Sequence, residues 1–344
     1  MYRALLLVFI TLLAGCSPSE QVVRISGPTM GTSYHIAWIG QPDSSKELQP
    51  LIDERLAAIN RSMSTYDPES ELSRINRGLT ATDGDGWMPV SADLYEVLND
   101  AVDIYRKSGG LFDISVGPLV NLWGFGPDAA LDEVPAADKL EAARQNVGLD
   151  VLILRPQPTA IRLSAPRYLD LSAIAKGWGV DDIASLLESH GLHNYMVEIG
   201  GEIRTAGAKA DGSLWRIAVE RPSSAPGDRS IELIIEPGDS AVATSGDYRN
   251  YFEQDGVRYS HTINPFTGRP VTHTLASVTV VLPSSAMADG WATALDVAGP
   301  EQGMALAEQY DLPVFMIVRE GDHFRELASS RFKERFPHYR NEAY

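Results

Sequence analysis

The sequence predicts a single α+β domain in which helices flank mostly antiparallel sheets. Helix-like and strand-like patterns are interspersed along the 344 residues, but the strand-like runs of the second half follow one another without crossover helices. No long Pro-, Gly- or Ser-rich linker divides the chain, and a hydrophobic content of 44% is normal for a globular protein with a sizeable core. These observations favour an antiparallel arrangement over a doubly wound parallel fold.

The first half of the chain begins with an extended run over residues 22–39, interrupted at Met30-Gly31-Thr32. A helix is expected at 48–63, where apolar residues recur at helical spacing: Leu51, Ile52, Leu56, Ile59 and Met63. Three more helices are expected, each ended by a nearby glycine as a C-terminal signal: 92–107, 136–147 and 178–190. Two short runs, 151–154 and 160–163, predict a hairpin around Pro156 and Pro158.

The second half is dominated by short strand patterns. Two helical stretches, 286–297 and 301–310, interrupt them near the end of the chain. The expected strands are 195–199, 215–220, 231–236, 240–244, 251–254, 257–262, 277–282, 314–318 and 324–328.

The formal net charge of −17 limits the possible partners. It argues against nucleic acid, whose binding needs a basic patch, and against broad adhesion to anionic lipid. An acidic protein that binds an anionic ligand needs a local source of positive potential, such as a metal ion or a helix N-terminus.

The N-terminus has the features of an export signal. Residues 1–16 carry one Arg, a short apolar run, and small residues before Cys16, the only cysteine. The sequence Leu-Ala-Gly-Cys resembles the bacterial lipobox, although a plain signal peptide with a chance cysteine is the alternative. We therefore expect a lipoprotein signal peptide at 1–15, a lipidated tether at 16–21 and the functional domain at 22–344. The protein would be exported and lipid-anchored to a bacterial membrane, facing the periplasm.

A histidine beside a rigid turn is the first candidate catalytic group. His261 lies in the sequence YSHTINPFTGRPV, just before an Asn-Pro-x-x-Gly turn at 264–268. A rigid turn beside a titratable imidazole is a way of holding a catalytic group still. The alternative is a histidine that only packs beside a surface turn.

A carboxylate and a hydroxyl share one face of the late helix. Asp289 and Thr293, in AMADGWATAL, are four residues apart. Oxygen ligands of this kind suit a hard cation such as Mg²⁺. The alternative is that Asp289 simply caps the N-terminus of the helix.

Small-residue turns provide candidate phosphate-binding backbone. In LDLSAIAKGWGVDD, a strand-like run ends at Asp170 and leads through a turn containing Lys176 into a helix. The sequence is not a Walker loop, and an ordinary strand-to-helix connection is the alternative. Gly200-Gly201 predicts a tight turn, residues 244–250 predict a polar glycine loop, and Tyr66 could stack on a planar ring. Residues 124–129 match a loose GxGxxA, but no helix opens there, so we discount a dinucleotide fingerprint.

Together and in this order, the motifs resemble the ApbE family of FAD:protein FMN transferases. The resemblance extends over nearly the whole chain after residue 22 and implies a T-fold-like α+β domain. It rests on these segments: the early MGT, STYDPESELSRIN, GLFDISVGPLVNLWGFG, DLSAIAKG, VEIGGEIRTAG, ATSGDYRNY, SHTINPFTGRPV and ADGWATAL.

The resemblance implies a Mg²⁺-dependent enzyme that cleaves the pyrophosphate of FAD, transfers FMN to a Ser/Thr hydroxyl of a partner protein and releases AMP. The implied acceptors are flavin-carrying subunits of membrane redox pumps of the Nqr or Rnf type. Asp289, Thr293 and the backbone carbonyl of Ala173 would bind Mg²⁺. The implied FAD-site residues are Met30, Tyr66, Leu111, Phe112, Asp113, Asp170, Lys176 and Ile263.

The chain differs from some members of the family at two positions. It has Ala292 where they carry a second carboxylate, and Lys176 where they carry an acid. A poor hydroxyl nucleophile needs a base near pH 7, and His261 suits that role. Two other functions stay open: a Mg²⁺-dependent FAD pyrophosphatase that gives FMN and AMP to water, and a lipid-anchored FAD-binding protein without turnover. Metal delivery is disfavoured, because the cysteine and seven histidines form no ligand-spaced cluster.

Overall fold

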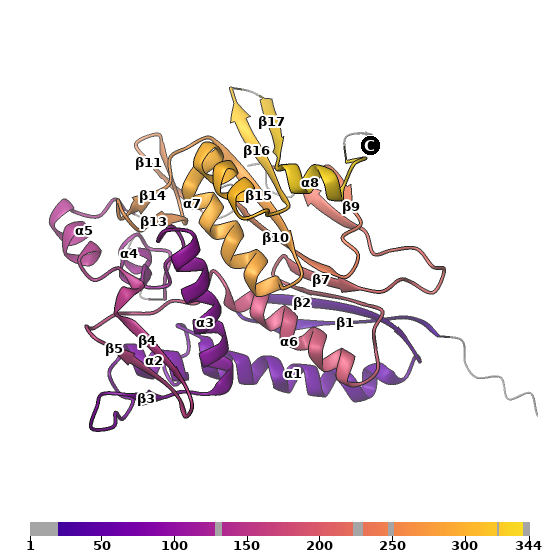
Figure 1. The fold of residues 1–344 in the computed structure, drawn as a ribbon, viewed down its shortest axis with the longest axis horizontal. Helices are drawn as coiled ribbons and strands as arrows, with labels where there is room; N and C mark the ends of the chain where they lie inside the picture. The colour runs from indigo at the N-terminus through magenta and orange to yellow at the C-terminus, as the bar shows by residue number, and fades with distance from the viewer. Residues whose placement is uncertain (1–19, 128–132, 223–229, 247–250, 322, 340–344) are drawn as a thin grey trace, which may run out of the picture.

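The computed structural model describes residues 20–127, 133–222, 230–246, 251–321 and 323–339. The expected signal peptide and the candidate lipidated Cys16 lie outside these residues. Within the described part, no helix is long and apolar enough to cross a membrane. The described elements form the α+β arrangement of helices and antiparallel sheet that the sequence predicts (Figure 1).

An eight-stranded sheet runs through the centre of the molecule, and all its pairings are antiparallel. Its strands in spatial order are β1 (Gln21–Thr29), β2 (Thr32–Gly40), β6 (Tyr195–Ile199), β7 (Glu202–Ala206), β10 (Ser240–Gly246), β15 (Leu275–Leu282), β16 (Val314–Glu320) and β17 (His323–Ala328). The interruption at Met30-Gly31 is the turn between β1 and β2. Gly200 and Gly201, both with positive φ, form the predicted tight turn between β6 and β7.

The remaining strands form smaller antiparallel sheets that are separate from the central one. The predicted hairpin is β4 (Leu152–Pro156) with β5 (Thr159–Leu163), extended by β3 (Met88–Pro89). The other ladders are β8 (Ile217–Glu220) with β9 (Ile231–Ile235), β11 (Tyr251–Gln254) with β12 (Val257–Ser260), and β13 (Ile263–Asn264) with β14 (Arg269–Pro270).

Helices α1, α6 and α7 cover one face of the sheet, and α3 packs on α1 and α7 (Figure 1). Successive residues of a strand point to opposite faces, so the sheet has two cores. On β16, Met316 packs into the large core beneath these helices, whereas Phe315 packs beneath β8, β9 and α8. The helices are α1 (Ser44–Met63), α2 (Glu71–Asn76), α3 (Ala92–Lys107), α4 (Gly117–Leu122), α5 (Ala137–Arg144), α6 (Ala175–Ser189), α7 (Ser285–Gln309) and α8 (Ser330–Arg335), with a 3₁₀ turn at Leu149–Val151.

Most elements are confirmed, and α3 has both of its predicted ends. The two predicted late helices are the halves of α7, which are separated by a non-helical Gly299. Three details were wrong. Helix α6 begins at Ala175, so Lys176 lies in its first turn and not in the turn before it. Residues 244–246 belong to strand β10 and not to a loop, while 247–250 lie outside the described residues. Leu51 is exposed on α1.

Besides the two-residue strands and the 3₁₀ turn, four described elements were missed: β7, α2, α4 and α8. The three helices have only six residues each, which is too short for a helical period to repeat. Strand β7 carries Glu202, Arg204 and Thr205, and these polar residues hide its strand pattern.

Candidate active site

Helix α7 packs on the central sheet, with α6 beside it and α3 packed against it (Figure 1). Asp289, Thr293 and Asp296 occupy positions i, i+4 and i+7, so they share one side of the helix. We call these three residues the α7 face. Its two carboxylates are buried, with Asp289 5% exposed and Asp296 0% exposed. A buried carboxylate is costly unless other groups stabilise its charge, so the partners of each are informative.

Asp289 is not a helix cap. Helix α7 begins at Ser285, and the hydroxyl of Ser284 accepts the Met287 N–H at 3.2 Å, so the capping alternative was wrong. Asp289 Oδ2 instead accepts a hydrogen bond from the Gly177 N–H at 3.1 Å, and Lys176 Nζ lies 3.9 Å away. Burial raises the pKa of Asp289, while Lys176 and the Gly177 N–H act in the opposite direction.

The first turn of α6 packs directly on the first turn of α7. A Cβ on Gly177 would lie 2.3 Å from the Ser285 carbonyl oxygen, so only glycine allows this approach. Gly177 is in the first turn of α6, where backbone N–H groups have no partner within the helix. Asp289 accepts the hydrogen bond of this N–H instead.

These groups fit a hard divalent cation. A carboxylate, the Thr293 hydroxyl and a backbone carbonyl are oxygen donors of the type that Mg²⁺ prefers. Thr293 Oγ1 lies 3.4 Å from Ser245 Oγ on strand β10, which supplies a further oxygen nearby. Among the described residues there is no group of three or more His, Cys, Asp or Glu side chains placed to hold a metal. A cation here would therefore complete its shell with water or substrate phosphate, as Mg²⁺ commonly does.

Lys176 forms an ion pair with Glu202, a buried carboxylate that the sequence analysis did not single out. Glu202 begins β7 directly after the Gly200-Gly201 turn. A Cβ at Gly200 would lie 2.8 Å from the Thr32 side chain and 3.1 Å from that of Lys176, so the turn lies close to both. The acid after the two glycines was visible in the sequence, but its burial was not.

Met30 lies against helix α6. It has a left-handed φ of 48°, in the turn between β1 and β2. A Cβ on Gly179 would lie 2.9 Å from the Met30 methyl carbon, so this glycine makes room for the side chain on α6. Met30, Lys176, Asp289 and Thr293 thus gather around the starts of α6 and α7.

A second group of predicted residues lies beside the first. Asp113 Oδ1 accepts from the Ser115 N–H and hydroxyl at 2.7 and 2.6 Å, and burial raises the pKa of Asp113. The Asp170 N–H donates to the Ile114 carbonyl at 2.7 Å, which joins the two segments. Leu111 and Phe112 are buried, so a ligand could reach this run mainly through its backbone.

This second group contacts α7 through Phe112. A Cβ at Gly290 would lie 2.4 Å from Ile104 and 3.5 Å from the Phe112 ring, so α7 packs closely on both. Because Gly290 directly follows Asp289, the Leu111–Asp113 run lies beside the candidate cation site.

Tyr66, Phe125 and His261 form a third group. Tyr66 is 66% exposed, its hydroxyl lies 3.5 Å from the Phe125 carbonyl, and partial burial and the negative Asp170 raise its pKa. The edge of the Phe125 ring faces the His261 imidazole, with centroids 6.3 Å apart and planes at 72°. Ile263 is buried in the aromatic cluster below, with Trp123.

The turn after His261 is the one that the sequence predicts. Asn264 Oδ1 accepts the N–H groups of Phe266 and Thr267 at 2.9 and 3.1 Å, and the Gly268 N–H donates to the Asn264 carbonyl at 2.8 Å. Thr262, the residue between His261 and β13, donates its hydroxyl to Asp296 Oδ2 at 2.9 Å. The α7 face therefore connects the candidate cation site to the His261 segment.

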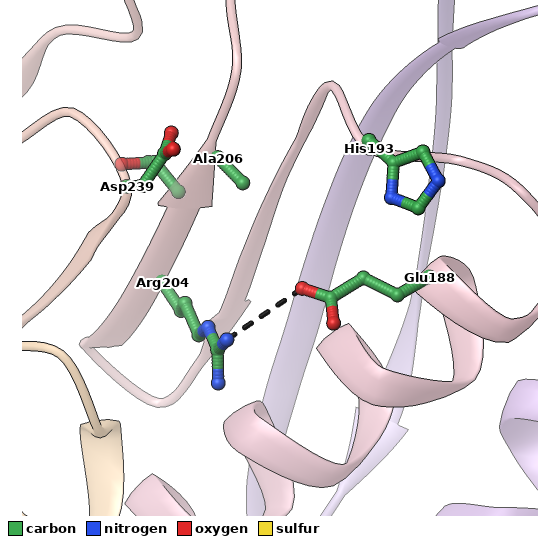
Figure 2. A pocket seen from close by; sticks show the side chains of 6 residues that line it. Glu188, His193, Arg204, Ala206 and Asp239 are labelled. Atoms are coloured by element: carbon green, nitrogen blue, oxygen red, sulfur yellow. Dashed lines mark ion pairs between the residues drawn. The ribbon is translucent and has the colours of Figure 1, made fainter.

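Two hollows in the described part of the chain are lined by other residues. Figure 2 shows one of about 200 Å³, which we call the Arg204 cavity. Its lining residues are Glu188, His193, Arg204, Thr205, Ala206 and Asp239. The other, of about 350 Å³, is lined by Arg61, Glu69, Glu71, Arg74, Thr80 and Ala81. Neither contains a residue predicted for the site.

Comparison with known proteins identifies the family. The ApbE family profile matches residues 30–316, from Met30 to strand β16. The chain belongs to the ApbE family. The FAD:protein FMN transferase of Vibrio cholerae is 51% identical over 330 residues, which cover 95% of this chain and 96% of the relative. That of Haemophilus influenzae is 40% identical over 328 residues, covering 94% of each chain.

Solved ApbE structures share the fold. The flavin transferase ApbE from Vibrio cholerae superimposes with a TM-score of 0.83 at 50% identity, over 92% of this chain and 99% of that one. The apo form of the Pseudomonas stutzeri flavinyl transferase ApbE gives 0.83 at 38% identity, over 92% and 97%. Family membership confirms the resemblance inferred from the motifs and the predicted single α+β domain.

Proposed function

We propose that this chain transfers FMN from FAD to a serine or threonine hydroxyl of a partner protein, in a Mg²⁺-dependent reaction that releases AMP. Relatives up to 51% identical over 95% of the chain carry the name FAD:protein FMN transferase. The observation that carries the proposal is the α7 face, which presents the oxygen donors Asp289 and Thr293 and is hydrogen-bonded through Asp296 to the segment that follows His261.

The chain's own residues would bind and orient the diphosphate of FAD. Asp289, Thr293 and the Ala173 carbonyl would hold Mg²⁺, which when bound offsets the negative charge of the diphosphate. Lys176 places a positive charge beside Asp289 and would contact the phosphates. Met30, Tyr66, Ile263, Asp170 and the Leu111–Asp113 run would contact the rest of FAD, since they surround the starts of α6 and α7 and the His261 segment.

His261 would accept the proton of the attacking hydroxyl. The acceptor oxygen forms a bond to the phosphorus on the FMN side of the diphosphate, and the bond from that phosphorus to the bridging oxygen breaks. The leaving group is AMP, and the proton of the hydroxyl goes to the imidazole. Phosphoryl transfer depends mainly on positioning and charge stabilisation, so one base and one cation site are sufficient protein machinery.

The proposed cellular setting follows from the N-terminal sequence and the family. Cys16 would be lipidated, which would place the enzyme on a bacterial membrane facing the periplasm. The proposed acceptors are flavin-carrying subunits of Nqr- or Rnf-type redox pumps. Partition of the wild-type protein, but not of Cys16→Ser, into a detergent phase would support the anchor, and equal partition of both would contradict it.

A gel assay tests the proposed reaction. The purified protein is incubated with FAD, Mg²⁺ and a candidate acceptor subunit, and the mixture is denatured and separated. We expect flavin fluorescence on the acceptor band and AMP release in equal amount, with both lost when the acceptor Ser/Thr is changed to Ala. Fluorescence that stays free with AMP released would indicate a hydrolase. Bound FAD without AMP would indicate a binding protein.

A further inference from the structure

Thr262 is held by three hydrogen bonds. Its N–H donates to Ser260 Oγ at 3.2 Å, its carbonyl accepts from the Val271 N–H at 3.0 Å, and its hydroxyl donates to Asp296 Oδ2 at 2.9 Å. The first two bonds belong to the local hairpin. The third crosses 34 residues of sequence to helix α7, so it has to be explained by the tertiary structure.

Asp296 is fully buried at the far end of the α7 face, and the proposed reaction gives it no role. Its backbone carbonyl lies 2.6 Å from His273 Nε2, so Asp296 contacts the chain on both sides of the hairpin that follows His261. Burying a carboxylate costs desolvation free energy, and a neutral side chain could accept the same hydrogen bond without that cost. The position of Asp296 therefore calls for a more specific explanation.

We propose that Asp296 and Thr262 are positioning residues that set the distance between His261 and the candidate cation site. Seven residues separate Asp289 from Asp296, which corresponds to about 10 Å along the helix axis. The Cα of His261 is about 3.8 Å from that of Thr262, because the two residues are joined by a trans peptide. One rigid helix therefore fixes both the oxygen donors and the segment that carries the base.

The other side of His261 is bounded by an aromatic ring. The Phe125 edge faces the imidazole at 6.3 Å, while Thr262 is hydrogen-bonded to α7. The imidazole thus faces Phe125, which follows α4, while the next residue is tied to the α7 face. A displacement of about 1 Å in such an arrangement can lower a rate by about 10²-fold without changing substrate affinity.

This inference rests on the proposed function and concerns kcat rather than binding. A purely structural hydrogen bond would change stability but not the kcat of the molecules that stay folded. A positioning bond would lower that kcat itself and leave KM for FAD unchanged, because the Thr262 hydroxyl contacts Asp296 and none of the residues proposed to bind FAD or Mg²⁺. The kcat of the folded protein, measured together with KM and thermal stability, therefore separates the two explanations.

The test is Thr262→Val, which removes the hydroxyl and keeps the shape. We expect kcat for FMN transfer to fall about 10- to 100-fold, with KM for FAD and the Mg²⁺ dependence unchanged. Thr262→Ser restores the hydroxyl and should recover most of kcat. The matched control is Thr205→Val, because Thr205 is also buried and donates to a carbonyl, that of Gly238, at 2.6 Å beside the Arg204 cavity.

A double variant guards against loss of folding. Thr262→Val leaves Asp296 short of one hydrogen bond, whereas Thr262→Val with Asp296→Leu replaces both partners by apolar groups and recovers stability. We expect the double variant to unfold near the wild-type temperature and still to show the reduced kcat. Wild-type kcat in either variant, or an equal loss in Thr205→Val, would overturn the inference. Absence of FMN transfer by the wild-type protein would instead contradict the proposed function.

Discussion

Charged side chains gather both at the α7 face and in the Arg204 cavity, but the two regions differ in how those charges are paired and buried. In the cavity, Arg204 pairs with Asp181 at 2.9 Å and with Glu188 at 3.5 Å, the pair drawn in Figure 2. On the α7 face, Asp289 and Asp296 are buried, and Asp289 has one backbone N–H and a lysine 3.9 Å away. In the cavity, the positive charge of Arg204 is therefore balanced by two carboxylates.

This contrast shows that a hollow in the surface need not be the place where reactive groups gather. Balanced, solvated ion pairs contribute little and are common on protein surfaces. A buried carboxylate with a raised pKa, such as Asp289, is found more often at functional sites than elsewhere. The contrast supports the proposed location of the reaction at the α7 face, and matched changes in the Arg204 cavity are expected to leave the reaction unaffected.

The largest expected effect is that of Asp289→Asn. The variant keeps the shape but removes the charge that would hold the cation, so FMN transfer should fall by at least about 10³-fold. The residual rate should no longer rise with Mg²⁺ concentration. Steady-state rates across a Mg²⁺ series measure this, with Asp239→Asn in the Arg204 cavity as the control. Normal Mg²⁺ activation of Asp289→Asn would place the cation elsewhere.

The second effect is that of His261→Ala. General-base assistance is worth about 10²- to 10⁴-fold, so FMN transfer should fall by that factor while the Kd for FAD is retained. Single-turnover transfer and FAD titration measure the two quantities. His193→Ala removes the histidine of the Arg204 cavity and should change neither. A near wild-type rate in His261→Ala would exclude His261 as the base.

A smaller effect is expected at the Lys176–Glu202 ion pair. Removing one partner would leave a buried charge, so we combine Lys176→Met with Glu202→Gln. The loss of a positive charge beside the diphosphate should weaken FAD binding about tenfold. Isothermal titration at two salt concentrations measures the change, with Lys209→Met near Trp215 as the control. Equal FAD affinity in the double variant and the wild type would remove Lys176 from the phosphate site.

The smallest effect concerns Asp100 on α3. Its charged neighbour Asp181 connects the Arg204 cavity to the start of α7. Asp181 pairs with Arg204 and also accepts the Ala286 N–H at the start of α7. Burial raises the pKa of Asp100 to about 6, and the negative Asp181 adds to the shift. The stability that protonated Asp100 contributes is therefore fully present below pH about 4 and is lost as the pH rises through about 6.

Asp100→Asn should therefore raise the free energy of unfolding at pH 7.5 by about 1 kcal/mol, allowing for solvent screening, and have no effect at pH 4. Urea unfolding at both pH values measures the difference. Asp103→Asn, on the same helix and paired with Lys107 on the surface, is the control. Stabilisation that is equal at both pH values would show that the raised pKa of Asp100 is not its cause.

Local signals in the sequence were enough for much of the fold. Helix α3 has a clear apolar period, a Ser91 cap and a glycine-rich end, and it was predicted at both ends. Helix α6 was started too late because Gly177 and Gly179 suggest a turn. The structure shows that both glycines are needed for close packing, against Ser285 and Met30. That requirement comes from tertiary contacts and is invisible in the local pattern.

The site was predictable only in part for the same reason. The shared face of Asp289 and Thr293 follows from helical spacing, and His261 was singled out from the rigid turn that follows it. The Ala173 carbonyl and most of the FAD-site roles came from the family resemblance. Glu202 and Asp296 were not singled out, because an acid after a glycine turn or on a helix is normally exposed. Their partners, Lys176 and Thr262, are 26 and 34 residues away in sequence.

A crystal structure with FAD and Mn²⁺, used for its anomalous signal in place of Mg²⁺, tests the central claim most directly. We expect the metal between the side chains of Asp289 and Thr293, with the FAD diphosphate bound to it and within reach of His261. A metal or diphosphate bound away from the α7 face, for example in the Arg204 cavity, would contradict the account.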